Sequence, residues 1–265
     1  MSTDVRDHIT GTYLSLRLGM ALIAIFFPIV LWLGGVAEGQ PLQDSMSAYY
    51  FSGGGAMRDV FVGVLFAIGA FLYVYKGFND LENIALNLAG VFVIGVAIFP
   101  TEWNCGSACQ KITLHGTCAV LFFLCIAYVA IFRAPDTLSL IKSDEKIRHY
   151  KLMYRLLGWG MVASPAIALV LTYVLQPGTV DRSTIFFVEA VAVLMFAAYW
   201  LTKSREIMET NAEVLALAGK IAPSAPARAA DLLEPLPIHL VGSAPIPSEV
   251  QNDRRRLAMR RRNPS

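Results

Sequence analysis

Residues 18–36 read Leu-Gly-Met-Ala-Leu-Ile-Ala-Ile-Phe-Phe-Pro-Ile-Val-Leu-Trp-Leu-Gly-Gly-Val, a run without a charged side chain. A helix needs about 20 mainly apolar residues to cross the hydrocarbon core of a bilayer, and this run is close to that length. The segment before it carries Asp4 and Asp7 as well as Arg6 and Arg17, which is untypical of a secretory signal peptide. We therefore expect residues 18–36 to form a retained first transmembrane helix.

Five further runs have the same apolar character and contain almost no charged residues. They cover residues 60–75, 84–99, 112–132, 154–175 and 183–201. Of all 265 residues, 16% are charged and 55% hydrophobic, against about 25% and about 45–50% in soluble domains. Since backbone polar groups in lipid must be satisfied within the protein, helices are favoured over open sheets. The sequence predicts an all-α, polytopic membrane bundle of six transmembrane helices.

The charged residues divide the chain into three parts. Residues 1–17 are expected to form a cytoplasmic N-terminal segment, and residues 18–205 the transmembrane domain. Residues 206–265 are rich in Ala, Pro and charge, which predicts a largely disordered basic tail. Within it, residues 211–221 are a candidate short amphipathic helix. The Arg-rich stretch 254–262 is either a contact for anionic lipid or only a topological anchor.

The distribution of Lys and Arg predicts the orientation in the membrane, because basic residues concentrate in cytoplasmic connections. The connection between the fourth and fifth runs is rich in basic residues, and so is the tail, which opens with Lys203 and Arg205. The connections between the first and second, the third and fourth, and the fifth and sixth runs offer only Arg58, Lys111 and Arg182. We expect both termini in the cytoplasm of a bacterial cell and the chain in the inner membrane, with the lipid bilayer as its main partner and no nucleic-acid partner.

Several polar residues fall at the predicted outer face. A charged residue at a helix centre costs roughly 2.5–3.5 kcal/mol on insertion scales, so such residues usually face the bundle interior. Glu189 lies within the last run, and we interpret it either as a functional carboxyl group or as a structural hydrogen-bonding group. The same two interpretations hold for the other candidate catalytic or binding residues of this face, which are Ser47, Tyr49, Tyr50, Arg58, Asp59, Glu102 and His115. We predict that Asp59, His115 and Glu189 meet in one polar cavity that opens outward.

The four cysteines lie within one loop and the helix that follows it. Cys105 and Cys109 fall in the predicted outer loop, where an oxidising compartment favours a disulfide, although two free thiols remain the alternative. Cys118 and Cys125 are seven residues apart, on one face of a helix, and we interpret them as small packing residues.

Five short motifs carry a resemblance: Ser-Met-Ser-Ala-Tyr-Tyr at 45–50, Met-Arg-Asp-Val-Phe-Val-Gly at 57–63, Asn-Leu-Ala-Gly at 87–90, Ile-Phe-Pro-Thr at 98–101, and His115. With these motifs the chain resembles an uncharacterised family of bacterial multi-pass membrane proteins over roughly residues 12–205. That resemblance implies a membrane location and no particular activity.

A more distant likeness rests on the order of Ser47, Asp59 and His115. This order is similar to that in the CREST superfamily of putative membrane hydrolases, which includes alkaline ceramidases, and implies a zinc-dependent hydrolase acting on lipid. The chain lacks the paired His-x3-His and the seventh span of that superfamily, so a three-histidine zinc site cannot form. A mixed zinc site of Asp59, His115 and Glu189 is the chemically reasonable substitute.

Three classes of function follow from the sequence. The first is a non-enzymatic membrane protein, such as a transporter, a sensor or an assembly factor. The second is a metal-dependent or acid/base hydrolase acting on a lipid at the outer face. The third is a carrier that uses Glu189 as a proton or cation site. We rank the non-enzymatic class first, and note that polar residues concentrated in one half of the bundle count against a complete path for a carrier.

Overall fold

The structure is a computed structural model that describes residues 3–101, 113–173 and 183–217. Its helical elements, in chain order, are α1 (Thr3–Ala37), η1 (Ser47–Phe51), α2 (Ala56–Val74), α3 (Asp80–Ile98), α4 (Leu114–Tyr128), η3 (Val129–Arg133), η4 (Ala134–Leu140), α5 (Asp144–Tyr173), α6 (Thr184–Thr210) and α7 (Ala212–Leu217). Here η1 and η4 are 3₁₀ helices, and η3 is a single π-helical turn that continues α4.

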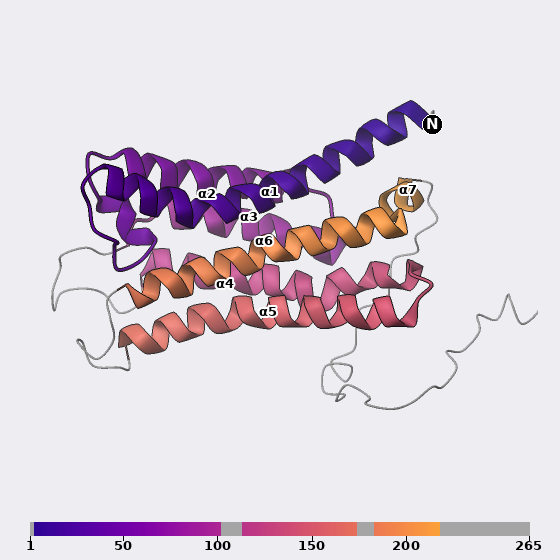
Figure 1. Ribbon diagram of the computed structural model, residues 1–265. Coiled ribbons are helices and arrows are strands. Elements are labelled where there is room, and N and C mark those ends of the chain that lie inside the picture. The colour runs from indigo at the N-terminus through magenta and orange to yellow at the C-terminus, as the bar shows by residue number, and fades with distance from the viewer. Residues whose placement is uncertain (1–2, 102–112, 174–182, 218–265) are drawn as a thin grey trace, which may run out of the picture. The chain divides into compact units, whose positions relative to one another are not determined.

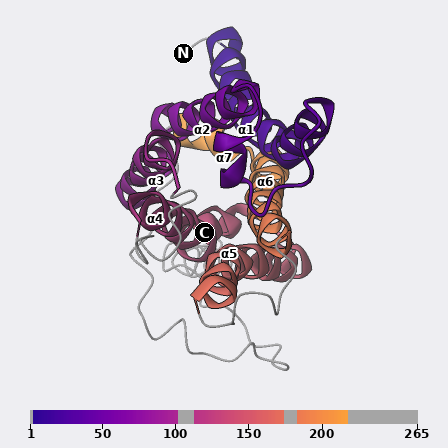
Figure 2. The ribbon, with the colours of Figure 1, turned by 90° about the vertical axis from the view of Figure 1, so that its left-hand side faces the viewer.

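Six helical stretches are long and apolar enough to cross a membrane, which confirms the six predicted spans; the fourth runs continuously through α4, η3 and η4, and the others lie in α1, α2, α3, α5 and α6. They run side by side and pack in chain order, α1 against α2 and so on to α6, and α6 packs against α1 to close the ring (Figures 1 and 2). The start of α1 and the short α7 lie at the same end of the bundle (Figure 1). We call this the α7 end, and the opposite end, which carries η1, the η1 end.

Apolar side chains fill the space between the helices. Phe61, Leu72, Ile126, Phe196 and Trp200 are all at most 3% exposed and belong to one continuous core with residues of every long helix. Close helix contacts depend on glycine: a Cβ at Gly69 would meet the backbone oxygen of Gly90, and the reverse also holds. Many large apolar side chains on the outer faces, such as Phe26 and Trp159, are more than half exposed, as expected for surfaces that contact lipid.

Side-chain caps determine where two of the helices begin. Asn79 accepts a hydrogen bond from the backbone N–H of Glu82 at 2.8 Å, and the Glu82 carboxylate accepts one from the N–H of Phe78, also at 2.8 Å. The two bonds satisfy the backbone N–H of Glu82 in the first turn of α3 and that of Phe78 just before the helix. Thr113 caps α4 in the same way, accepting from the N–H of Gly116 at 3.0 Å.

The helices match the predicted spans closely at the η1 end and extend well beyond them at the α7 end. Thus α1 begins at Thr3 instead of residue 18, α5 at Asp144 instead of 154, and α6 continues to Thr210 instead of 201. The predicted boundary at residue 205 therefore cuts through a helix whose Glu206 is fully buried. Of the predicted amphipathic segment 211–221, residues 212–217 are helical.

Candidate functional site

A loop folds back over the η1 end of the bundle and carries three of the predicted site residues, Ser47, Tyr49 and Tyr50. Two hydrogen bonds attach it to the start of α6: the Glu189 carboxylate accepts from the backbone N–H of Met46 at 2.7 Å, and the N–H of Phe186 donates to the carbonyl of Asp44 at 3.1 Å. Tyr49 belongs to this loop, and its side chain is fully buried, with its ring centroid 6.0 Å from that of Phe186 at the start of α6. The loop is therefore part of the packed bundle.

Glu189 is the predicted residue whose environment is most unusual. Its side chain is partly exposed, and it lies one and a half turns into α6, about 7.5 Å along the helix from Thr184. Among the described residues no Lys, Arg or His forms an ion pair with it. A carboxylate held among apolar helices without a counter-charge is costly, so the group favours binding a proton or a cation.

The hydroxyl groups near Glu189 form a local network. Ser45 Oγ and Ser47 Oγ lie 2.9 Å apart, and the N–H of Ala48 donates to Ser45 Oγ at 3.0 Å. The Tyr49 hydroxyl accepts from the N–H of Gln43 at 3.5 Å. Burial raises the pKa of Tyr49 above its ordinary value, so its hydroxyl stays neutral at physiological pH. These groups form a neutral, hydrogen-bonding rim beside the carboxyl group of Glu189.

His115 is engaged in the neighbouring helix pair. Its Nδ1 lies 2.9 Å from the carbonyl oxygen of Phe99 and 3.1 Å from that of Val96, so Nδ1 carries the proton and donates it to the end of α3. The ring stacks on Phe61 with centroids 6.4 Å apart. This arrangement supports the structural interpretation, in which the imidazole satisfies carbonyls that α3 leaves free at its C-terminus.

Asp59 lies on the surface, where its side chain is 76% exposed and forms an ion pair of 3.4 Å with the neighbouring Arg58, which is 50% exposed. The structure thus places Asp59 in solvent, His115 against α3 and Glu189 beneath the loop. Within the described ranges, no three His, Cys, Asp or Glu side chains lie close enough together to hold a metal ion. The structure therefore does not bring Asp59, His115 and Glu189 together as the predicted mixed zinc site requires.

The remaining predicted residues fall into three sets. Glu102, Cys105 and Cys109 lie outside the described residues, so the disulfide and the loop acid stay predictions. Cys118 and Cys125 are free thiols that pack against the core, as expected from their spacing. Tyr50 is half-buried and contacts the ring of Phe51, with centroids 5.0 Å apart.

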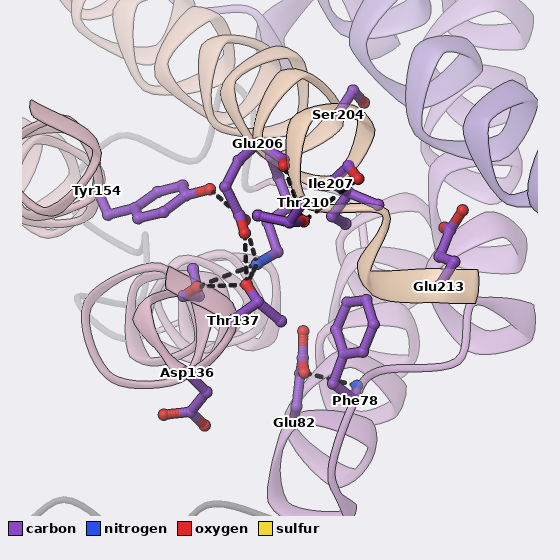
Figure 3. Close-up of polar contacts among 12 residues, drawn as sticks. Phe78, Glu82, Asp136, Thr137, Tyr154, Ser204, Glu206, Ile207, Thr210 and Glu213 are labelled. Atoms are coloured by element: carbon purple, nitrogen blue, oxygen red, sulfur yellow. Dashed lines mark hydrogen bonds and ion pairs between the residues drawn. The ribbon is translucent and has the colours of Figure 1, made fainter. Parts of the chain in front are cut away.

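The α7 end contains a buried polar cluster that the sequence analysis missed. Lys203 is 1% exposed and Glu206 is fully buried, and Lys203 Nζ donates to the Glu206 carboxylate at 2.7 Å. The same carboxylate accepts from the hydroxyl of Thr137 at 2.7 Å and from that of Tyr154 at 3.0 Å (Figure 3). Lys203 also donates to Thr137 Oγ1 at 2.7 Å and to the Ala134 carbonyl at 3.0 Å. Helices α5 and α6 are thereby joined to η4 around a fully compensated ion pair.

A second buried cation extends this cluster toward α7. Arg17 is 1% exposed and pairs with Glu213 of α7, and it donates to the hydroxyls of Tyr75 and Ser204 at 3.3 Å each. Burial raises the pKa of Tyr75, while the Arg17 guanidinium opposes that rise. This contact fastens α7 to α1 and α6.

A third ion pair joins the end of η3 to η4. Arg133 is 4% exposed and lies 3.5 Å from the carboxylate of Asp136, which also accepts from Asn79 at 3.1 Å. Glu82 is 2% exposed, and its carboxylate faces the same end of the bundle from the start of α3 (Figure 3). Acids and bases from four different elements are therefore buried at the α7 end.

The sequence offered one signal for this cluster. Lys203 and Glu206 are three residues apart, so they lie on one helical face. In the sequence analysis Lys203 served only as a topological marker, and the structure shows instead that it lies inside the bundle. The other partners come from segments that are distant in sequence, such as Thr137 and Tyr154, and only the tertiary structure brings them together.

No protein-family model, curated protein or solved structure matches this chain. The functional argument therefore rests on the geometry of the two polar regions described above.

Proposed function

We propose that this integral membrane protein is a non-enzymatic transporter in which Glu189 is the binding site for a proton or a small monovalent cation. One observation carries the proposal. The Glu189 carboxyl group accepts a backbone N–H from Met46, is partly exposed, and has no ion-pair partner among the described residues. A group of this kind alternates readily between a free and an occupied state, which is what a carrier requires.

Polar residues are not confined to the η1 end, although those at the α7 end hold helices together. A carrier needs polar groups in both halves of the membrane, and the sequence analysis assigned them mainly to the η1 end. Lys203 and Glu206 supply buried polar groups near the opposite end of α6. About 26 Å of helix separates Glu189 from Glu206, and the core between them includes Phe196 and Trp200. In the proposed cycle this apolar stretch is the barrier between the two ends.

The orientation that accompanies the proposal follows from the basic residues. With the α7 end in the cytoplasm, as the positive-inside rule predicts, Glu189 binds its proton or cation from the outer side of a bacterial inner membrane. A small-molecule or lipid ligand that enters the rim of Ser45, Ser47 and Tyr49 would be carried with it.

The test uses the purified full-length protein in liposomes that contain a trapped pH-sensitive dye. A potassium gradient with valinomycin imposes a membrane potential, and the entry of protons is followed with and without external sodium. We expect flux above that of protein-free liposomes, and we expect Glu189→Gln to reduce it to the protein-free level. The amide keeps the size of the side chain and its acceptor for Met46, but it cannot bind a proton.

The matched control is Glu209→Gln, since Glu209 lies on the same helix, is 43% exposed and pairs with Lys146 at 2.9 Å. This variant should transport as the wild type does. Wild-type liposomes that show no proton entry by the dye and no uptake of radioactive sodium above the protein-free level, or a Glu189→Gln variant with full flux, would exclude the proposal.

A further inference from the structure

The turn that leads into α2 lies against the residue that ends α1. Glu38 follows the last residue of α1, and residues 52–55 read Ser-Gly-Gly-Gly. A Cβ at Gly53 would overlap the Oε2 atom of Glu38, so the carboxylate contacts the turn where only glycine leaves room. Gly53 and Gly55 have φ angles of +64° and +100°, which favour glycine. The local sequence thus wraps backbone closely around one carboxylate.

Two oxygen atoms of this turn are buried and lack any hydrogen-bond partner. Within the described residues only three side-chain polar atoms have this property, namely Glu38 Oε2, Ser52 Oγ and Trp200 Nε1. Two of the three lie at the same turn, and Ser52 as a whole is only 6% exposed. Leaving a buried polar atom unpaired costs about 1–3 kcal/mol, and more for a charged group. Two such costs at one place indicate that the turn is completed by a ligand.

The missing ligand has to be positively charged. Glu38 lies at the C-terminus of α1, where the helix dipole is negative and disfavours a carboxylate. The basic residue on the far side of the turn, Arg58, pairs with Asp59, and no ion pair of Glu38 exists within the described part of the chain. The charge of Glu38 is therefore left without compensation by the side chains around it.

We propose that Glu38 and the Ser52–Gly55 turn form a binding site for a hard divalent cation, with Ca²⁺ as the ion that fits best. The available donors are all oxygens, which suit Ca²⁺ and not a soft metal. Besides Glu38 Oε2 and Ser52 Oγ, the carbonyls of Gly53 and Gly54 accept no backbone hydrogen bond in the described structure. Both glycines are exposed, so water can complete the 6–8 oxygen ligands, roughly, that Ca²⁺ takes.

A cation at this position would join the end of α1 to the segment between η1 and α2. It would therefore fix the loop that covers Glu189, although the site stands on Glu38 and Ser52 alone and does not depend on the role of Glu189. With a single carboxylate ligand, we expect weak affinity, with a Kd of about 10⁻⁴–10⁻³ M, as in extracellular Ca²⁺ modules.

The test is calorimetric titration of the purified, chelator-treated full-length protein with Ca²⁺, accompanied by thermal unfolding with and without the ion. We expect one Ca²⁺ per chain and a rise in melting temperature. Glu38→Gln should weaken binding by more than about tenfold, because affinity follows the charge of the ligands. Ser52→Ala, which keeps that charge, should weaken it less and should reduce the rise in melting temperature.

The matched control is Asp59→Asn, which removes a nearby but exposed acid and should leave binding unchanged. Melting of Glu38→Gln at the wild-type temperature in the absence of Ca²⁺ would show that the variant folds. An absence of Ca²⁺ binding to the wild type, equal binding by Glu38→Gln, or loss of binding in Asp59→Asn would each overturn the proposal.

Discussion

Helix α6 carries two glutamates in opposite environments. Glu206 is fully buried and is bound by Lys203, Thr137 and Tyr154, so its charge is compensated completely. Glu189 is partly exposed, accepts a backbone N–H from Met46 and forms no ion pair among the described residues. The comparison teaches that a carboxyl group within a membrane helix is not by itself a functional signal. Its partners distinguish a group that holds helices together from one that is free to bind and release an ion.

The largest effect should come from breaking the compensated pair. Lys203→Met removes the cation and leaves Glu206 buried without its charge partner, which we expect to destabilise the protein by about 3–5 kcal/mol. Unfolding in mixed detergent micelles measures the change. The control is Lys146→Met. The ion pair of Lys146 with Glu209 is exposed, so its loss should lower the free energy of unfolding by only about 0–1 kcal/mol.

The double variant Lys203→Met/Glu206→Met sharpens this prediction. Replacing a whole buried ion pair by apolar side chains is often close to neutral, so the double variant should recover much of the stability lost in Lys203→Met. If it is as unstable as the single variant, the loss comes from packing and not from an uncompensated charge.

A smaller effect is expected at the contact of α7. Glu213→Gln leaves the buried Arg17 with the hydroxyls of Tyr75 and Ser204 and removes its charged partner. We expect the free energy of unfolding to fall by about 1.5–3 kcal/mol, since a hydrogen bond to a charged group contributes about this much. Hydrogen exchange should show faster opening of residues 212–217, whereas the exposed Glu145→Gln should leave both measurements unchanged.

Alkaline pH tests the same end of the bundle. Because burial raises the pKa of Tyr75 above its ordinary value, the folded state favours the neutral phenol. The stabilisation is therefore fully present below the ordinary pKa of about 10 and is lost as the pH rises above it. Tyr75→Phe should cost about 0.5–1.5 kcal/mol at neutral pH and should make the alkaline loss of stability shallower. An unchanged alkaline slope would contradict this account.

The smallest effect on stability belongs to Glu189. Glu189→Gln keeps the acceptor for Met46 and removes no ion pair among the described residues, so the free energy of unfolding should change by less than about 1 kcal/mol. The comparison then predicts opposite outcomes along one helix, with flux lost at Glu189 and stability lost at Lys203. A large destabilisation by Glu189→Gln would make Glu189 a structural residue of the same kind as Glu206.

Much of the fold could be predicted from the sequence, because apolar runs of sufficient length determine the spans. The predicted helix ends were accurate where the runs end in loops, for example at residue 36 against Ala37. The predicted helices were too short at the α7 end, because a prediction from hydropathy takes every charged residue to lie outside the membrane bundle. Arg17 is buried because Glu213, from a distant segment, neutralises it. Lys203 is buried because Glu206 on its own helix and Ala134 and Thr137 of η4 bind it. The contacts between distant segments are not visible in a pattern within one segment.

The candidate site was only partly predictable, for a related reason. Glu189 stood out as a carboxyl group in an apolar run, and the structure gives it a loop donor and no counter-ion in the described ranges. Asp59 has the same chemistry but ends in solvent beside Arg58, because it faces away from the ring. Which side of a helix a residue occupies depends on packing between helices, which the sequence alone does not specify.

The most direct test of the central claim is difference infrared spectroscopy of the reconstituted protein, in which the carboxyl band of Glu189 is identified by its absence in Glu189→Gln. The account predicts a band assigned to Glu189 that changes with pH or with added sodium, while the bands of the Lys203–Glu206 pair stay constant. A Glu189 band that responds to neither would contradict the claim that this carboxyl group binds and releases an ion.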